Sequence, residues 1–87
     1  MNNVIVTPTS WRQYCDLMVT DKALVNRINE LIKDISRNGL SNGIGKPERL
    51  KHIDACSRRI NQEHRLVYNL DSDKNIQIIA CKEHYMD

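Results

Sequence analysis

The apolar residues of this chain follow a helical period before residue 39 and a strand period after it. Leucine, valine and isoleucine recur at helical spacing along residues 22–38, and charged side chains occupy many of the positions between them. The segment GLSNGIGKPE at 39–48 contains three glycines and a proline, so it predicts a loop. The change of period therefore places helices in the first half of the chain and strands in the second.

The first helix is predicted to follow a short strand-forming segment at residues 3–6. Ser10 and Gln13 have the spacing of a capping box, which places the start of the helix at Trp11. Its apolar stripe is expected to consist of the residues at i, i+3, i+4 and i+7, namely Trp11, Tyr14, Cys15 and Met18.

The second helix is predicted to begin after Thr20 or Asp21, either of which can act as its N-cap. Asn38 and Gly39 give it a C-terminal stop. Its apolar face is expected to comprise Leu24, Ile28, Leu31, Ile32 and Ile35. The two helices therefore form an antiparallel hairpin with a single apolar face.

The second half of the chain predicts three or four antiparallel strands. The segments RLKHI, CSRRIN and HRLVYNL are rich in strand-forming residues, and the polar turn DSDKN connects the last of them to IQIIACKEHY. In this final strand, alternation places His84 on the same side as Ile78 and Ala80. We expect one α+β domain over residues 1–87, with the N-terminal strand and the helix hairpin on one face of a twisted antiparallel sheet and the other face available.

Length and composition narrow the class of protein. Eighty-seven residues form one domain with a modest core. The N-terminal residues lack the pattern of a signal peptide, and no apolar run is long enough to cross a membrane, so we expect a soluble cytoplasmic protein. Cys15, Cys56 and Cys81 are widely spaced, so we expect small buried residues in a reducing compartment, with no metal site.

The formal net charge of +2 does not by itself indicate a polyanionic partner, but its distribution is uneven. Between residues 46 and 65, six basic residues outnumber three acidic ones. The basic residues are Lys46, Arg49, Lys51, Arg58, Arg59 and Arg65, and the acidic ones are Glu48, Asp54 and Glu63. Two interpretations fit this stretch, a solvated sheet surface or a phosphate-binding face.

Seven polar residues on or beside the predicted sheet would suit cleavage of RNA by its own 2′-hydroxyl. They are Glu48, Lys51, Arg58, Arg59, Arg65, His84 and Tyr85. In such a reaction one group takes the 2′ proton, another protonates the leaving 5′ oxygen, and cations offset the charge that builds on the phosphorus. DNA lacks this internal nucleophile, so the site would discriminate against it.

Each of these residues also has a structural explanation. Glu48 can pair with a neighbouring base, and Arg65 can form an ion pair across a hairpin, which contributes little energy. Arg58 and Arg59 are adjacent on a strand and point to opposite faces, and alternation does not say which one faces outward. His84 can be an ordinary strand residue, and two further histidines have the same chemical capacity.

Three segments carry a resemblance to a known family, namely GKPERLKH, SRRINQEHRLVY and ACKEHY. In this order and spacing they resemble the YoeB/Txe ribonucleases of type II toxin–antitoxin systems, within the wider RelE/ParE superfamily. The pair SW at 10 and 11 resembles the start of that family's first helix, and TDKALVNRINELIKDI resembles its second helix. The resemblance spans most of the chain and implies a RelE-like α+β fold.

The resemblance implies a toxin that cleaves messenger RNA in the ribosomal A site without a metal or other cofactor. By motif, Glu48 corresponds to the general base, His84 to the general acid, and Arg65 to the residue that steadies the scissile phosphate. Tyr85 would shape the site beside the base or the leaving group. The residues expected to bind the RNA backbone or its phosphates are Lys46, Lys51, Arg58 and Arg59.

The resemblance also implies partners. It implies a YefM-type antitoxin whose disordered C-terminal segment wraps the toxin, the 70S ribosome with its mRNA, and a homodimer. The sequence departs from the family pattern in two places. Ala55 and Cys56 stand where the family usually has a glycine and aromatic residues, and Arg49 stands where it often has proline.

Two other functions are open at this point. A ParE-like toxin of the same fold would poison a DNA topoisomerase without being an enzyme, and it would not need Glu48, His84 or Tyr85. A module that only binds RNA or a partner chain would show binding that weakens steeply with salt, and no cut product. The presence of these three residues and Arg65 in family register favours the nuclease.

Overall fold

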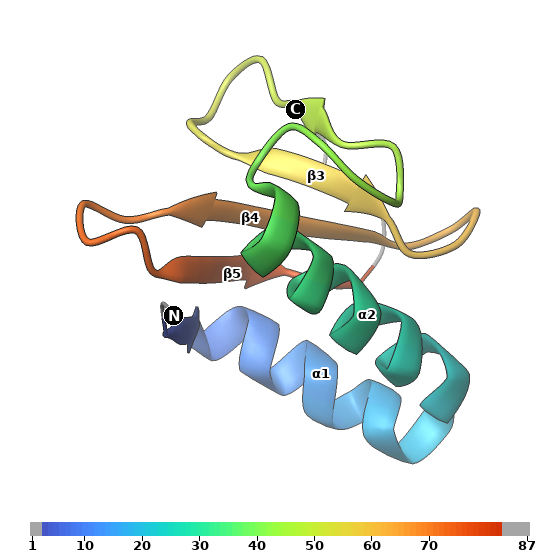
Figure 1. Cartoon of the computed structure of the whole chain (residues 1–87). Coiled ribbons are helices and arrows are strands. Elements are labelled where there is room, and N and C mark those ends of the chain that lie inside the picture. Colours follow the sequence, from blue (N-terminus) through green and yellow to red (C-terminus); the bar gives the residue numbers. More distant parts are fainter. Residues whose placement is uncertain (1–2, 83–87) are drawn as a thin grey trace.

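The computed structural model describes residues 3–82, in which two helices and five strands follow the predicted order (Figure 1). The strand β1 (Val4–Val6) precedes the helices α1 (Pro8–Thr20) and α2 (Lys22–Asn38). The remaining strands are β2 (Glu48–Arg49), β3 (Cys56–Arg59), β4 (Arg65–Leu70) and β5 (Ile76–Ala80). The α+β class predicted from the sequence is confirmed.

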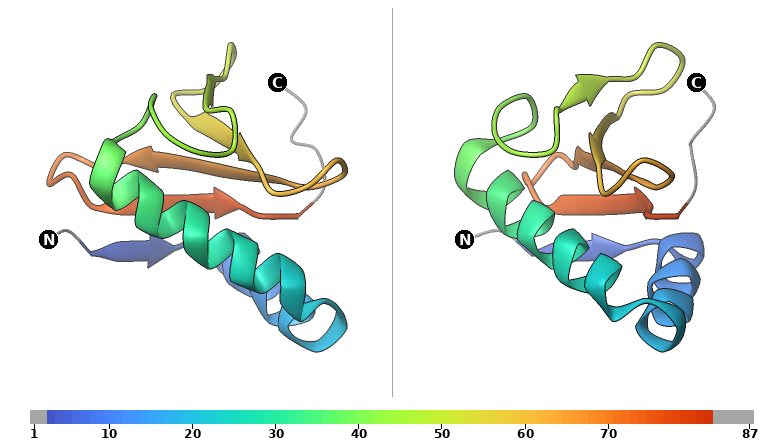
Figure 2. Two further views of the ribbon diagram at one scale, coloured as in Figure 1. Left: turned by 45° about the vertical axis from the view of Figure 1, so that its right-hand side comes forward. Right: turned by 90° about the vertical axis from the view of Figure 1, so that its right-hand side faces the viewer.

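The five strands form one sheet in the order β1-β5-β4-β3-β2. Strands β2 to β5 pair antiparallel as predicted, whereas β1 pairs parallel with β5, so the sheet is mixed. The parallel pair requires a long connection from one strand to the other, and the two helices are part of it. Both helices lie on the same face of the sheet (Figure 2).

Helix α1 begins three residues earlier than the sequence analysis predicted. Thr7, not Ser10, is the N-cap, and Pro8 occupies the first turn, where a missing N–H costs nothing. The Thr7 side chain accepts a hydrogen bond from the Ser10 backbone N–H, and the Ser10 side chain accepts one from that of Thr7. The Ser10 hydroxyl also donates to the carbonyl of Ile78 at 2.8 Å, so this cap joins α1 to β5.

The apolar stripe predicted for α1 is only partly confirmed, because Tyr14 packs against the main core and Cys15 is half-buried, but Trp11 and Met18 do not belong to it. The buried residues of α1 are Ser10 and Leu17, whereas Trp11 and Met18 are about half exposed, at 54% and 49%. The earlier start of α1 does not explain this difference, because the spacing of the residues along the helix is the same for either start. The difference arises because α1 packs on β5 and α2 along the side that Ser10 and Leu17 share.

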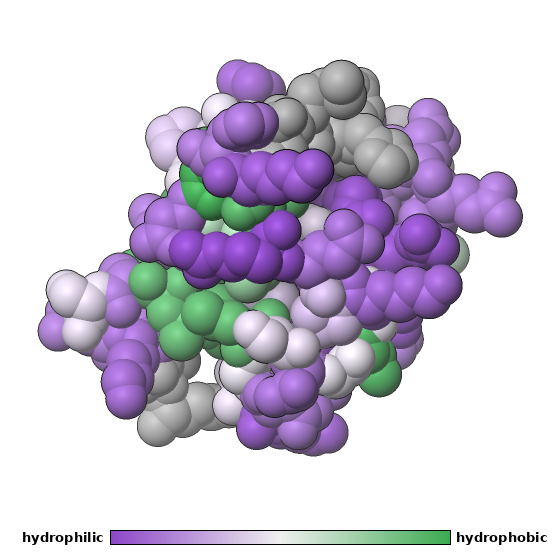
Figure 3. Space-filling model, turned by 90° about the horizontal axis from the view of Figure 1, so that it is seen from above, coloured by the Kyte–Doolittle hydropathy of each residue, from purple (hydrophilic) through white to green (hydrophobic). Residues whose placement is uncertain are grey.

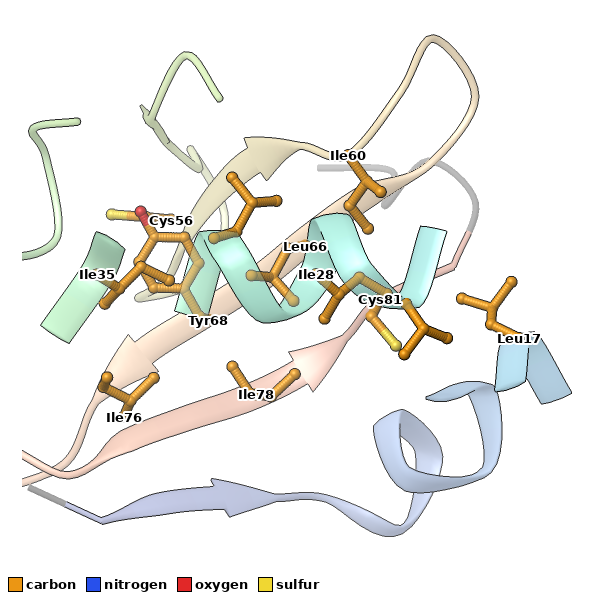
Figure 4. Close-up of a cluster of buried hydrophobic side chains, with 12 residues drawn as sticks. Leu17, Ile28, Ile35, Cys56, Ile60, Leu66, Tyr68, Ile76, Ile78 and Cys81 are labelled. Atoms are coloured by element: carbon orange, nitrogen blue, oxygen red, sulfur yellow. The ribbon is translucent and has the colours of Figure 1, made fainter. Parts of the chain in front are cut away.

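Helix α2 agrees with the prediction. The Asp21 side chain caps it by accepting a hydrogen bond from the backbone N–H of Leu24, and Gly39 ends it with a φ of 85°. Its buried residues are Val25, Ile28, Leu31 and Ile35, and all four belong to the main core with side chains of β3, β4 and β5. Figure 4 shows Ile28 and Ile35 in this core. Leu24 and Ile32 are partly buried beside that core.

The strand predicted at RLKHI is much shorter in the structure. β2 contains only Glu48 and Arg49, and residues 50–55 form a bend instead. The bend is closed by a backbone hydrogen bond from Leu50 to Ala55 at 2.9 Å and by the ion pair between Arg49 and Asp54. These contacts hold the bend where the sequence predicted a strand.

A β-bulge in β5 corrects the predicted alternation. Tyr68 pairs with Ile78 and Val67 with Ala80, so one extra residue, Ile79, is inserted in β5. Ile78 accordingly belongs to the main core and Ala80 to a smaller cluster with Val67. The expectation that Ile78 and Ala80 share a side is therefore wrong, and the orientation inferred from it for His84 loses its basis.

The sheet face away from the helices is only partly open. Its small apolar cluster contains Ala55, Val67 and Ala80, and the bend 50–55 adds Leu50 and Ile53 to it. The cysteines are free thiols, of which Cys56 and Cys81 are buried and Cys15 is half-buried. Burial raises the pKa of the Cys81 thiol to about 11, so it stays protonated at neutral pH.

Candidate functional site

Most of the predicted site residues lie on or around the uncovered end of the sheet face that points away from the helices. Directly paired residues of antiparallel strands share a face. Glu48 pairs with Ser57, Ser57 with Val67, and Arg59 with Arg65, so these residues belong to the face away from the helices. Seen from the β2 side, the surface of the molecule is largely hydrophilic, with a hydrophobic area between the hydrophilic side chains (Figure 3).

Arg65 is the most buried cation on this face, with 11% of its side chain exposed. Its Nε donates a hydrogen bond to the Ser57 hydroxyl oxygen at 3.1 Å. Its Nη2 lies 3.6 Å from the nearer carboxylate oxygen of Glu48, which is an ion pair but too long for a hydrogen bond. Nη2 is buried and has no hydrogen-bond partner among residues 3–82. A guanidinium with an unused buried donor is suited to an anionic ligand.

Glu48 is the counterpart of Arg65 and differs from it in exposure. Its side chain is 62% exposed, so its carboxylate contacts both Arg65 and solvent. The carboxylate approaches the guanidinium from β2, the edge strand that follows the glycine-containing loop. The structure thus brings together an accessible carboxylate and a nearly buried guanidinium, which can hold a phosphate and accept a proton beside it.

Arg58 does not belong to this site, and its assignment as a phosphate-binding residue is corrected. Its side chain is fully buried on the helix side of the sheet. It forms an ion pair with the Asp34 carboxylate and donates to the Tyr68 hydroxyl oxygen at 2.9 Å. Its other donors reach the carbonyls of Gly39, Asn42 and Ile44 at 2.7 to 3.1 Å. Arg58 therefore fastens the loop after α2 to the sheet and has no access to a ligand.

This buried cluster changes the titration of its members. The hydrogen bond from Arg58 holds the pKa of the Asp34 carboxyl below its ordinary value. Burial raises the pKa of the Tyr68 hydroxyl, which donates to the carbonyl of Leu40 at 2.6 Å. Both groups therefore keep their ordinary charge states at neutral pH, an ionised Asp34 and a neutral Tyr68.

The remaining predicted cations lie at the surface around the same end of the sheet. Lys51 is exposed on the bend 50–55, and Arg59 is exposed at the end of β3. Lys46 is exposed two residues before Glu48, with a left-handed φ of 52°. His84 and Tyr85, the predicted general acid and its neighbour, lie outside the described residues.

Sequence reasoning missed Ser57, Asp34 and Asn69. The strand parity of Ser57, which matches that of Arg65, could have indicated its role, because paired strands align residues of one face. Asp34 meets Arg58 across 24 positions, and no local pattern predicts such a pair. Asn69 donates to the carbonyl of Asp54 at 3.2 Å, and its own carbonyl oxygen is buried without a hydrogen-bond partner among the described residues.

The other two histidines occupy different environments from the site. His64 is buried at the turn between β3 and β4, with its Nε2 3.8 Å from the Glu63 carboxylate, and His52 is exposed on the bend 50–55. Within residues 3–82, no three His, Cys, Asp or Glu side chains are grouped so that they could hold a metal ion. Neither helix in this range combines the length and the apolar character needed to span a bilayer.

Comparison with known proteins decides the family. Residues 6–85 match the model of the YoeB-like toxins of bacterial type II toxin–antitoxin systems. This chain belongs to that family. The toxin YoeB of Escherichia coli K12 is 48% identical over 84 residues, which are 94% of this chain and 98% of that toxin.

Solved structures of YoeB proteins confirm the fold. The YoeB dimer from Staphylococcus aureus has a TM-score of 0.90 and 48% identity, covering 97% of this chain and 98% of that one. The heterotetrameric YoeB–YefM complex of the same organism gives 0.88 and 48%, covering 98% and 99%. The RelE–RelB complex from Pyrococcus horikoshii has a TM-score of 0.74 at 19% identity, covering 94% and 93%, which confirms the RelE-like fold alone.

Proposed function

We propose that this YoeB-family chain is a ribosome-dependent endoribonuclease that cleaves messenger RNA in the A site without a metal ion. Its toxicity would then come from the arrest of translation in the cytoplasm. The observation that supports the proposal is the pair of Arg65 and Glu48. In it a buried guanidinium nitrogen, which has no hydrogen bond to any described residue, lies beside an accessible carboxylate. A phosphodiester oxygen can occupy the unused donor of Arg65, which places the RNA sugar near Glu48.

The proposed reaction transfers one proton at each end of the scissile bond. Glu48 accepts the proton of the 2′-hydroxyl while the 2′ oxygen attacks the adjacent phosphorus. The bond from phosphorus to the 5′ oxygen breaks, and His84 donates a proton to that leaving oxygen. The products are a 2′,3′-cyclic phosphate and a 5′-hydroxyl end. Arg65 offsets the negative charge that grows on the non-bridging oxygens.

The exposed cations have a supporting role in this proposal. Lys51, Arg59 and Lys46 lie near Glu48 or Arg65 in the chain or in the sheet, and all three are exposed. They would bind the RNA backbone, which is a salt-dependent and sequence-independent contribution. Tyr85 would shape the site beside the base or the leaving group.

The proposal includes the partners that solved relatives contain. The S. aureus YoeB structures show a dimer and a heterotetramer with YefM. For this chain we expect a YefM-type antitoxin, a homodimer, and the 70S ribosome with its mRNA. The apolar residues exposed on β1 and α1, which include Val4, Ile5, Val6 and Trp11, provide surface that such contacts can bury.

Mapping of message ends after brief induction in cells tests the proposal. Wild-type chain should produce new ends inside translated codons, while Glu48→Ala combined with His84→Ala should produce none. Cuts by a folded double variant at the wild-type level would refute the residue roles. Arrested growth with uncut messages would refute the nuclease itself, and a supercoiling assay would then identify a topoisomerase poison.

A further inference from the structure

A second basic feature lies beside the Arg65 site. It is an open hollow of about 410 Å³ between α2, the loop before β2 and the turn that follows β3. Its lining residues are Arg27, Gly45, Lys46, Arg59, Ile60, Asn61 and Gln62. Three of them are cationic and none is acidic, so the lining carries a local positive charge.

Backbone geometry builds this hollow from segments distant in the chain. The backbone N–H of Arg59 donates to the carbonyl of Gly45 at 2.6 Å, which fixes the loop against the end of β3. Gly45 has a φ of 82°, and a Cβ there would lie 2.7 Å from a methyl of Leu31. Only glycine fits so close to α2, and this approach brings Lys46 to the rim of the hollow.

The cations of the hollow are weakly engaged within the protein. Arg27 forms an ion pair with Glu30 at 3.5 Å, and both side chains are partly exposed, at 34% and 63%. Such a pair on a helix surface is weak and can be exchanged for a ligand. The side chains of Lys46 and Arg59 form no hydrogen bond or ion pair with any residue from 3 to 82.

The backbone of Lys46 is also unusual for its residue type. Its φ of 52° lies in the left-handed region, which side chains other than glycine, asparagine and aspartate rarely adopt. Lys46 stands between Gly45, whose carbonyl is bonded to the end of β3, and the pair Pro47 and Glu48. Backbone strain of this kind concentrates at binding sites, because the surrounding structure has to hold it.

The hollow and the Arg65 site meet at one residue pair. Arg59 lines the hollow, and its Cα is paired with that of Arg65 across β3 and β4. The turn between these strands is held by the Asn61 side-chain oxygen, which accepts the backbone N–H groups of Glu63 and His64 at 2.8 and 2.6 Å. An RNA long enough to reach past Arg65 can therefore present another phosphate to a pre-formed basic hollow.

We propose that this basic hollow binds an RNA phosphate other than the one that is cleaved, with Arg27 as a ligand-binding residue. The inference rests on the proposed RNA substrate. The phosphate can come from the cleaved strand or from ribosomal RNA, and the same cations would recognise either. Arg27 thereby extends the proposed RNA contact from the strands onto helix α2.

Binding of two probes tests the hollow. The first is a short single-stranded 2′-O-methyl RNA, which lacks the free nucleophile and stays uncut, and the second is the ribosome without a message. Arg27→Gln and Lys46→Gln should each weaken binding several-fold. Each should reduce the slope of log affinity against log salt by about 0.7 if a single-stranded phosphate contact is lost. Arg37→Gln, on the same helix but outside the hollow, should bind like the wild type.

The two probes separate the sources of the phosphate. If Arg27→Gln binds the short RNA more weakly than the wild type does, the phosphate in the hollow comes from the cleaved strand. If it binds only the empty ribosomes more weakly, the phosphate comes from ribosomal RNA. Arg27→Lys should retain the wild-type slope, because the charge is kept. The proposal is overturned if Arg27→Gln binds both probes like the wild type, whatever Lys46→Gln does, or if Arg37→Gln weakens binding equally.

The outcome for the nuclease is read separately. If the wild-type chain cuts no message but binds RNA through Arg27, the proposed nuclease activity is refuted and the proposed phosphate binding in the hollow stands. A wild-type chain that cuts messages, with an Arg27→Gln variant unchanged in binding, would refute the hollow alone. Thermal unfolding of each variant checks that the fold is intact.

Discussion

Arg58 and Arg65 lie on opposite faces of the sheet, and the protein uses them differently. Arg58 on the helix side is fully buried, and its guanidinium bonds to five oxygens, including the Asp34 carboxylate. Arg65 on the other side is nearly as buried, but within residues 3–82 its side chain makes one hydrogen bond and Nη2 makes none. A buried cation with every donor used holds the fold together, whereas one with a spare donor is available to an anion.

The largest expected effect is on stability at Arg58. Replacing Arg58 by Ala leaves the Asp34 carboxylate and several loop carbonyls without their donor. Breaking such a buried pair costs about 3–5 kcal/mol of the free energy of unfolding. Urea unfolding should show this loss, while Arg59→Ala, one residue away and exposed, should change it by about 0.5 kcal/mol or less. Equal losses in the two variants would contradict the contrast between neighbouring positions.

The next effect is on catalysis at Arg65. We expect Arg65→Ala to lower the single-turnover cleavage rate by about 10²–10³, the cost of removing one donor to a developing charge. The fold should persist, because Arg65 carries only one side-chain hydrogen bond. The rate is measured on programmed ribosomes at saturating toxin. A folded Arg65→Ala variant that cleaves at the wild-type rate would remove this residue from the mechanism.

Ser57 should have a smaller effect of the same kind. Its hydroxyl accepts the hydrogen bond from Arg65 Nε, so Ser57→Ala loosens the guanidinium without removing it. A single hydrogen bond is worth about 0.5–1.5 kcal/mol, which corresponds to roughly a two- to tenfold lower rate. In an Arg65→Ala background the same substitution should have no further effect on the rate. Additive losses would show that Ser57 acts independently of Arg65.

The ion pair between Arg58 and Asp34 on the helix side of the sheet should make the free energy of unfolding depend on pH. The hydrogen bond from Arg58 lowers the pKa of the Asp34 carboxyl from its ordinary value of 3.8. As the pH falls, this carboxyl is therefore protonated in the unfolded chain before it is protonated in the folded chain. The stability that it contributes is therefore present above about pH 4 and is lost as the pH falls further. Asp34→Asn should flatten the decline in unfolding free energy over this range. An unchanged acid decline would place the responsible carboxyls elsewhere, with Asp71 as the next candidate, because the backbone N–H of Asn75 lowers its pKa.

Sequence patterns predicted the elements that rest on local chemistry. The period of Leu and Ile along α2 and the cap at Asp21 are local features, and the structure has both. The start of α1 was missed because Thr7 and Ser10 are both good N-cap residues, and Pro8 decides between them. The bulge at Ile79 was missed because an extra residue in a strand leaves the apolar pattern almost unchanged.

The site was predicted in part for the same reason. Motif resemblance predicts Glu48 and Arg65 as site residues, and their proximity in the structure agrees with that prediction without testing their roles. Alternation showed that Arg58 and Arg59 face opposite ways but not which one is buried. That choice depends on Asp34, which is distant in sequence and reaches Arg58 only after α2 has packed on the sheet. Long-range ion pairs of this kind lie beyond local patterns.

The most direct test of the central claim is a structure of this chain on the ribosome with an uncleavable 2′-O-methyl message in the A site. The proposed mechanism requires Arg65 Nη2 at hydrogen-bond distance, about 2.7–3.2 Å, from an oxygen of the scissile phosphate, with Glu48 beside the 2′ oxygen. A phosphate bound elsewhere on the chain, with Arg65 still joined only to Ser57 and Glu48, would contradict it.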